Sequence, residues 1–223
     1  MAPSSRISTR WSRASMFAVI AAVGLTGCFT GERPSFEDDD TAPAASTGNV
    51  EIDKVLGLLD SVDRSEFTVG YDITTNLNNI ESTGLVVQAE GRRRSVTIEN
   101  SERSVRFIQD AGEELTCDLL IGACEPSLLD ARISDTQLPH TFYGPAFANR
   151  LRADADRRIS DPTAYTKNIA GQEAQCVDLD VSGGTKTYCA LPAGPLAQFV
   201  GADVSIDLTS YSPRPDESKF ETS

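Results

Sequence analysis

The chain contains five cysteines and one histidine, the residue types that most often serve in catalysis, metal binding or disulfide bonds. A serine or cysteine hydrolase needs a histidine as its base, and His140, next to Pro139, is the single candidate. The sequence contains no Gly-x-Ser-x-Gly nucleophile elbow and no glycine-rich phosphate loop. Asp178 and Asp180 would share one face of a strand, as a glycosidase pair could, but solvated carboxylates are the simpler explanation in a chain with 33 acidic residues. We therefore expect no enzymatic activity and no cofactor.

Four of the cysteines, Cys117, Cys124, Cys176 and Cys189, form an even set that suits an oxidising compartment. Three pairings are open to them, and we favour the two local ones. A turn centred on Ser182-Gly183 would place Cys176 directly opposite Cys189 on antiparallel strands. A zinc site would be expected to show tight Cys-x2-Cys pairs, which neither pair has. We predict structural disulfides and no metal.

The fifth cysteine, Cys28, closes an N-terminal segment with a distinct composition. Arg6, Arg10 and Arg13 come first, and the apolar run 16–25 and the small residues Thr26 and Gly27 follow. That order predicts a removed signal peptide over residues 1–27, because the run is shorter than the roughly 20 residues that span a bilayer. Leu25-Thr26-Gly27-Cys28 resembles the lipobox of bacterial lipoproteins. The resemblance implies that Cys28 becomes residue one and carries acyl chains such as palmitate.

The net charge of the chain argues against some classes of binding partner. The net charge is −13, and loss of the three signal-peptide arginines makes the remaining chain still more acidic. An acidic domain disfavours nucleic acid and repels anionic lipid headgroups. Membrane contact must then come from the acyl chains on Cys28. We expect localisation at the cell membrane, on the extracytoplasmic side.

Two segments flank the predicted domain. Residues 28–48 are rich in Pro, Ser, Thr and acidic residues without apolar periodicity, which predicts a flexible tether about 25 Å in reach. Residues 212–223 contain two prolines and are mostly polar, so we expect a loose tail. The domain itself occupies residues 49–211.

Within the domain, apolar spacing predicts a helix followed by strands. Asn49 is a suitable N-cap for an amphipathic helix whose apolar stripe is Ile52, Val55, Leu56, Leu59 and Val62. Alternation then predicts strands at 67–73, 85–89, 96–98, 105–107 and 115–119. A region without alternation, 126–158, includes a second helix starting at Pro145. Further strands are expected at 165–169, 174–181, 185–191, 196–200 and 204–209.

This order predicts an α+β fold, a large curved antiparallel sheet (a half-barrel) with helices packed on one face. It resembles the LolA-like lipoprotein carriers and the mycobacterial lipoproteins of the LprG and LppX family. The resemblance rests on the lipobox, the helix before Phe67-Thr-Val-Gly-Tyr71, the meander, and the late hairpin from Gly171 to Cys189. Those families bind lipid between sheet and helices, which implies an apolar ligand here. The two expected disulfides are a departure from the LprG-like pattern.

Candidate ligand-lining residues are the apolar side chains expected between the sheet and the helices. They are Leu56, Leu59, Phe67, Val69, Tyr71, Val87, Val96, Phe107, Phe142, Phe147 and Leu151. These residues fill the domain as a solid core in one interpretation and leave a cavity for acyl chains in the other. Sequence alone does not separate the two.

Two functions remain open. The first is a non-enzymatic envelope lipoprotein that binds or carries a lipid or other apolar ligand. The second is a structural or interaction module that docks on an envelope or membrane protein complex. Arg92-Arg93-Arg94 is a possible anion-binding run, although arginines at a strand start more often solubilise or protect an edge.

Overall fold

The computed structural model describes residues 46–76 and 79–222, all of which lie in one compact unit, residues 44–223. The signal peptide, Cys28 and most of the tether lie outside the described residues. Within the described part, neither α-helix has the length and hydropathy needed to cross a membrane.

Two α-helices precede and interrupt the strands of this unit. Helix α1 (Val50–Asp60) buries Ile52, Val55, Leu56 and Leu59, and the side chain of Asn49 accepts hydrogen bonds from the backbone N–H groups of Glu51 and Ile52 at 3.0 and 3.2 Å. The predicted N-cap is therefore confirmed. Helix α2 (Pro145–Asp156) begins at Pro145 as predicted.

The described residues form an antiparallel sheet of 11 strands in the order β6-β5-β4-β3-β2-β1-β11-β10-β9-β8-β7. The first meander consists of β1 (Phe67–Thr75), β2 (Ile80–Ala89), β3 (Arg93–Glu99), β4 (Ser104–Asp110), β5 (Glu113–Asp118) and β6 (Ala123–Pro126). The second consists of β7 (Thr163–Ile169), β8 (Gln172–Val181), β9 (Gly184–Ala190), β10 (Leu196–Val200) and β11 (Val204–Ser212). Pairing of β1 with β11 joins the two meanders. Strand β6 was not predicted.

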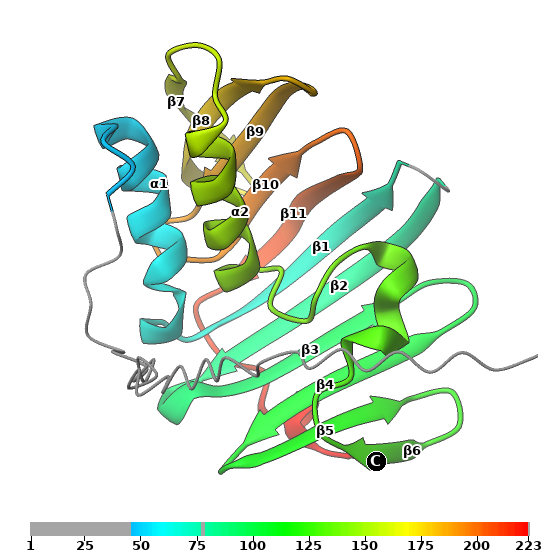
Figure 1. Ribbon diagram of the computed structural model, residues 1–223. Helices are drawn as coiled ribbons and strands as arrows, with labels where there is room; N and C mark the ends of the chain where they lie inside the picture. The colour runs from blue at the N-terminus through cyan, green and yellow to red at the C-terminus, as the bar shows by residue number, and fades with distance from the viewer. Residues whose placement is uncertain (1–45, 77–78, 223) are drawn as a thin grey trace, which may run out of the picture. The chain divides into compact units, whose positions relative to one another are not determined.

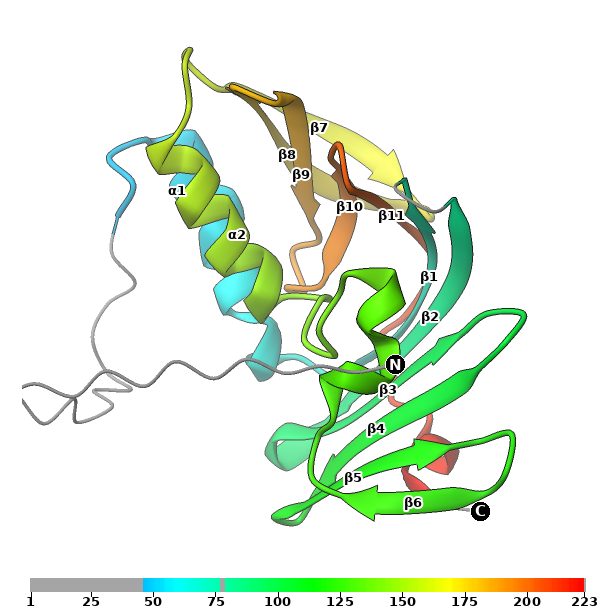
Figure 2. The same cartoon turned by 45° about the vertical axis from the view of Figure 1, so that its right-hand side comes forward.

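Figures 1 and 2 show a curved sheet with both helices on its concave side. Four short 3-10 segments complete the fold: η1 (Val62–Arg64), η2 (Glu90–Arg92), η3 (Asp130–Thr136) and η4 (Glu217–Phe220). Segment η3 packs over β1 and β2 on the same side as the helices, whereas η4 contacts β2 and β3. The α+β class and the large open antiparallel sheet are thus as predicted. We call the helix side the inner face and the opposite side the outer face.

Strand register decides which residues belong to each face, because successive side chains alternate. Phe67, Val69, Tyr71 and Ile73 of β1 point to the inner face, and Val86 of β2 lies opposite Val69. Val87 pairs with Thr68 and points outward, so its assignment to the inner face was wrong. The run Leu85-Val86-Val87 is apolar on both faces and carries no alternation that fixes its phase.

Candidate functional site

The predicted ligand-lining residues are buried and packed against one another. All eleven are at most 4% exposed, and ten of them, all except Val87, belong to one continuous core cluster. Aromatic rings fill the centre: Tyr71 and Phe142 lie 5.2 Å apart between centroids, and Phe147 lies 4.7 Å from Phe199. The inner face is therefore a solid core.

Open hollows occur at the strand ends, on the outer face and beside α1, and their walls are both polar and apolar. Hollows of about 520 and 620 Å3 share Glu81 and Asn100 at the ends of β2 and β3. A third, of about 310 Å3, lies on the outer face beside Thr97, Arg106 and Lys219. Of the eleven candidates, Tyr71 alone borders any of these three, and its hydroxyl group points away to donate to the carbonyl oxygen of Leu196 at 2.9 Å. Within the described ranges, no three acidic, histidine or cysteine side chains are placed to share a metal ion.

Two buried tyrosines, Tyr71 and Tyr143, place polar hydroxyl groups inside the otherwise apolar core. Burial raises the pKa of Tyr71 well above its usual value, and burial raises that of Tyr143 to about 12. Tyr143 lies near Arg94 and Asp63, which form an ion pair at 2.9 Å. Both phenols therefore stay neutral and act as structural groups.

A second buried polar cluster lies between α2 and β9. Asp154 is 4% exposed and accepts bonds from the Nζ of Lys186 at 2.7 and 2.8 Å. The hydroxyl of Tyr188 also donates to Asp154, and burial followed by this carboxylate raises the pKa of Tyr188. The partner Lys186 lies 32 residues away in sequence, so the pattern of α2 alone does not indicate that Asp154 is buried. The cluster joins helix to sheet.

His140 has a role in fixing the segment before α2. One carboxylate oxygen of Asp130 lies 2.7 Å from the backbone nitrogen of His140 and 2.9 Å from its Nδ1. The imidazole stacks on Phe107, with ring centroids 5.4 Å apart. In the part of the chain that the structure describes, no serine or cysteine side chain hydrogen-bonds to this ring. The arrangement lacks the nucleophile of a hydrolase dyad.

The acidic pair of β8 is divided between two sets of hydroxyl groups. Asp178 accepts from Tyr165 and Thr187 at 3.2 and 2.7 Å. Asp180 accepts from Thr185 and Ser160 at 2.6 and 2.9 Å, and these bonds lower its pKa. Both carboxylates are thus engaged with neighbouring side chains.

The arginine run is used inside the protein. Arg93 bonds Asp110 at 2.7 Å and Glu217 at 3.0 Å, and its guanidinium carbon lies 4.3 Å from the ring centroid of Phe220. Arg94 pairs with Asp63, while Arg92 occupies a turn with φ 64°. Two of the three arginines are therefore neutralised by the chain's own carboxylates.

The four domain cysteines form two disulfides, Cys117–Cys124 and Cys176–Cys189, the local pairs that the sequence favoured. In each pair the cysteines lie directly opposite each other in register. Cys176 and Cys189 belong to the core cluster, whereas Cys117–Cys124 closes the edge hairpin β5–β6. The tip of that hairpin exposes Leu120 and Ile121 by 65% and 75%.

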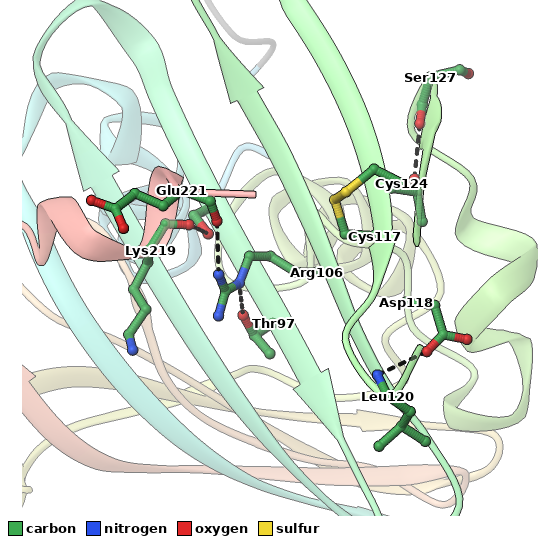
Figure 3. The surroundings of a disulfide bond; sticks show 11 residues. Thr97, Arg106, Cys117, Asp118, Leu120, Cys124, Ser127, Lys219 and Glu221 are labelled. Atoms are coloured by element: carbon green, nitrogen blue, oxygen red, sulfur yellow. Dashed lines mark hydrogen bonds between the residues drawn. A yellow bond between two sulfur atoms is a disulfide. The ribbon is translucent and has the colours of Figure 1, made fainter. Parts of the chain in front are cut away.

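The C-terminal segment differs from the loose tail that its composition predicted. Residues 213–222, which we call the strap, cross the outer face from β1 to β4. Ser95 Oγ donates to the carbonyl oxygen of Lys219 at 2.7 Å, and Arg106 Nη1 donates to that of Glu221 at 3.2 Å. Figure 3 shows Arg106 between Thr97 and Glu221, close to the Cys117–Cys124 disulfide. Sheet side chains that bind backbone carbonyls hold the strap despite its polar composition.

The sequence pattern predicts neither the strap nor β6, although two features indicate that the outer face is covered. Phe220 is an isolated aromatic residue in a polar segment, and Val105-Arg106-Phe107-Ile108 has apolar residues on both faces of β4. Ile108 is 3% exposed on the outer face. A strand with both faces buried requires a cover on each side.

Comparison with solved structures identifies a shared fold. The chain is similar to MucB, with a TM-score of 0.52 and 12% identity over 78% of this chain and 63% of MucB. The Pseudomonas aeruginosa MucA/MucB complex gives 0.49 and 13% identity, over 77% of this chain and 60% of that one. Mycobacterium tuberculosis lipoprotein LppX gives 0.38 and 12%, over 74% and 96%. No protein-family model and no curated protein matches the sequence. The chain spans less than two thirds of MucB, and the likeness concerns the fold alone.

Proposed function

We propose that this chain is a lipoprotein anchored through acylated Cys28 on the extracytoplasmic side of a membrane, and that its domain is a non-enzymatic module that binds another protein. The observation that carries the proposal is the solid inner face. Lipid carriers of this general architecture need a hollow between helices and sheet. Here Tyr71, Phe142 and Phe147 occupy that space.

The outer face supports protein binding as the alternative to lipid carriage. It already holds a polypeptide segment, the strap, through contacts with Thr68, Ser95 and Arg106. His140 Nδ1 is paired with the carboxylate of Asp130, which fits a function without bond-making chemistry. Binding would depend on surface complementarity.

Mass spectrometry of the lipoprotein extracted from membranes tests the proposal. Under denaturing conditions we expect the mass of residues 28–223 plus acyl groups on Cys28. Under native conditions we expect the same mass, because a filled core has no room for a second lipid. A stoichiometric lipid that is present in the native spectrum and lost on denaturation would instead establish a carrier.

A variant that opens the core serves as the control for this measurement. Phe142→Ala removes a fully buried ring that contacts Tyr71 and Tyr143. It should create a cavity that takes up a small apolar probe such as 1-aminoanthracene, as engineered apolar cavities do. The unsubstituted protein should not bind the probe. Equal binding by both proteins would show that the inner face is open.

A further inference from the structure

The strap is attached to the sheet mainly by hydrogen bonds to its backbone. Thr68 Oγ1 donates to the carbonyl oxygen of Arg214 at 2.9 Å and accepts from the N–H of Asp216 at 2.9 Å. Ser95 and Arg106 donate to the carbonyls of Lys219 and Glu221. Contacts of this type depend little on the sequence of the bound segment, because every residue offers the same carbonyl group.

Selectivity comes from Arg93, which recognises two side chains of the strap. Its Nη1 lies 3.0 Å from the carboxylate of Glu217, and its guanidinium plane lies over the ring of Phe220. Arginine combines charge with a flat face that stacks on aromatic rings, so one side chain serves both contacts. Asp110 holds Arg93 from the other side at 2.7 Å and fixes its direction.

Beneath the strap is a row of outer-face side chains that register places side by side. Val87, Ser95 and Ile108 follow one another across β2, β3 and β4, and each is at most 3% exposed. A hollow of about 310 Å3 adjoins this row at Thr97, Arg106 and Lys219. The outer face therefore has a partly apolar floor with polar groups around it, which is the composition of a protein-binding surface.

The strap can dissociate from the outer face without unfolding of the sheet. Its residues add no strand, and most of them are exposed. The sheet below is held by its own ladders and by the Cys117–Cys124 disulfide. Segments with few buried contacts open locally at a small fraction of the global free energy of unfolding.

We propose that the outer face of β1–β4 is a docking groove that the strap occupies as an autoinhibitory segment. The groove takes a segment of a partner protein that forms a 3-10 turn with an acidic residue three positions before an aromatic one, the arrangement of Glu217 and Phe220 in η4. This inference rests on the proposed function and names its partner class. Partner binding then requires release of the strap, so the apparent affinity equals the intrinsic affinity multiplied by the fraction of molecules whose strap is open.

Fluorescence anisotropy with a labelled peptide of residues 213–222 tests the groove on the full chain. The unsubstituted protein should bind weakly, because its own strap competes. Phe220→Ala loosens the strap and should tighten peptide binding about tenfold. Adding Arg93→Ala to Phe220→Ala should abolish that gain, and Val50→Ala, at an exposed position of α1, should leave binding as in the unsubstituted protein. A Phe220→Ala protein that binds no tighter than the unsubstituted one, or an Arg93→Ala addition without effect, would overturn the proposal.

Hydrogen exchange on the unsubstituted protein provides a second measurement that does not depend on any variant. The strap N–H groups of Asp216 and Ser218 should exchange at least a hundredfold faster than ladder N–H groups in β3. Equal protection would mean that the strap opens only with the whole sheet, and the proposal would fail. Failure of either test leaves the mass-spectrometric test of the protein-binding module unaffected, so the two proposals can be separated.

Discussion

The two faces of the sheet are covered by different physical means. On the inner face, α1, α2 and the segment before α2 contribute Leu59, Phe142 and Leu151 to a dry core. On the outer face, a polar strap covers Val87 and Ile108 through hydrogen bonds and a cation–π contact. The stabilisation from apolar burial grows with the buried area, so the helices stay attached to the inner face. The strap is held on the outer face by a few polar contacts, each of which contributes little.

The largest effect that would test this contrast is expected from the inner face. Leu59→Ala removes a fully buried side chain of α1 and should lower the free energy of unfolding by about 2–5 kcal/mol. Val50→Ala in the same helix is the matched control, because Val50 is 79% exposed, and it should change stability by less than about 0.5 kcal/mol. Urea unfolding followed by circular dichroism measures both. A loss below about 1 kcal/mol for Leu59→Ala would mean that the inner face is not a tight core.

An intermediate effect is expected from the disulfide of the edge hairpin. Replacing Cys117 and Cys124 with serine opens a link between residues seven apart and should destabilise the β5–β6 hairpin by about 2.5 kcal/mol. Native-state hydrogen exchange should show this loss in β5 and β6 and little change in β8 and β9. The same replacement at Cys176 and Cys189 provides the comparison, since that pair lies in the core cluster and should affect global unfolding. Identical exchange patterns in the two variants would contradict this division.

The smallest expected effect is the loosening of the strap at low pH. Hydrogen bonds from Ser218 lower the pKa of Asp216 below its usual 3.8. A carboxylate whose pKa is lowered in the folded state stabilises that state above its free pKa, and this stabilisation is lost as the pH falls through the folded value. The strap should therefore loosen in acid before the core does. The carboxylate of Asp216 is 45% exposed, so solvent screening keeps the effect small.

Two-dimensional NMR from pH 5 to pH 2 measures this acid response. The amide resonances of Ser218 and Lys219 should titrate together with the Asp216 carboxyl group, while those of Leu59 and Val69 stay unchanged. Ser218→Ala should move the midpoint back towards the usual aspartate value. Joint titration of the strap and the core would show that the two covers are not independent.

The sequence pattern predicted those features that depend on residues close together in the chain. The N-cap at Asn49, the start of α2 at Pro145 and the turn at Ser182-Gly183 are set by neighbouring residues, and all three are found in the structure. The α+β class followed from the spacing of the strands between two amphipathic helices.

Contacts between residues far apart in sequence could not be predicted from the local pattern. Val87 is buried on the outer face, where η4, which lies far away in sequence, contacts β2. The burial of Asp154 depends on Lys186 and Tyr188 of β9. Whether apolar side chains fill a space or line it depends on how closely helix and sheet approach, which the rings of Phe142 and Tyr71 decide in three dimensions.

The pairing of β1 with β11 has a consequence for how this chain matures. Each meander can assemble from neighbouring strands, but the centre of the sheet joins the first strand to the last. Until residues 204–212 arrive, the backbone of β1 presents an unpaired edge, which is a hazard for association with other chains. Closure across so long a stretch of sequence is slow compared with hairpin formation. A chain that is threaded through a membrane N-terminus first would therefore complete its sheet as the last step, and that interval is when a chaperone would protect it most.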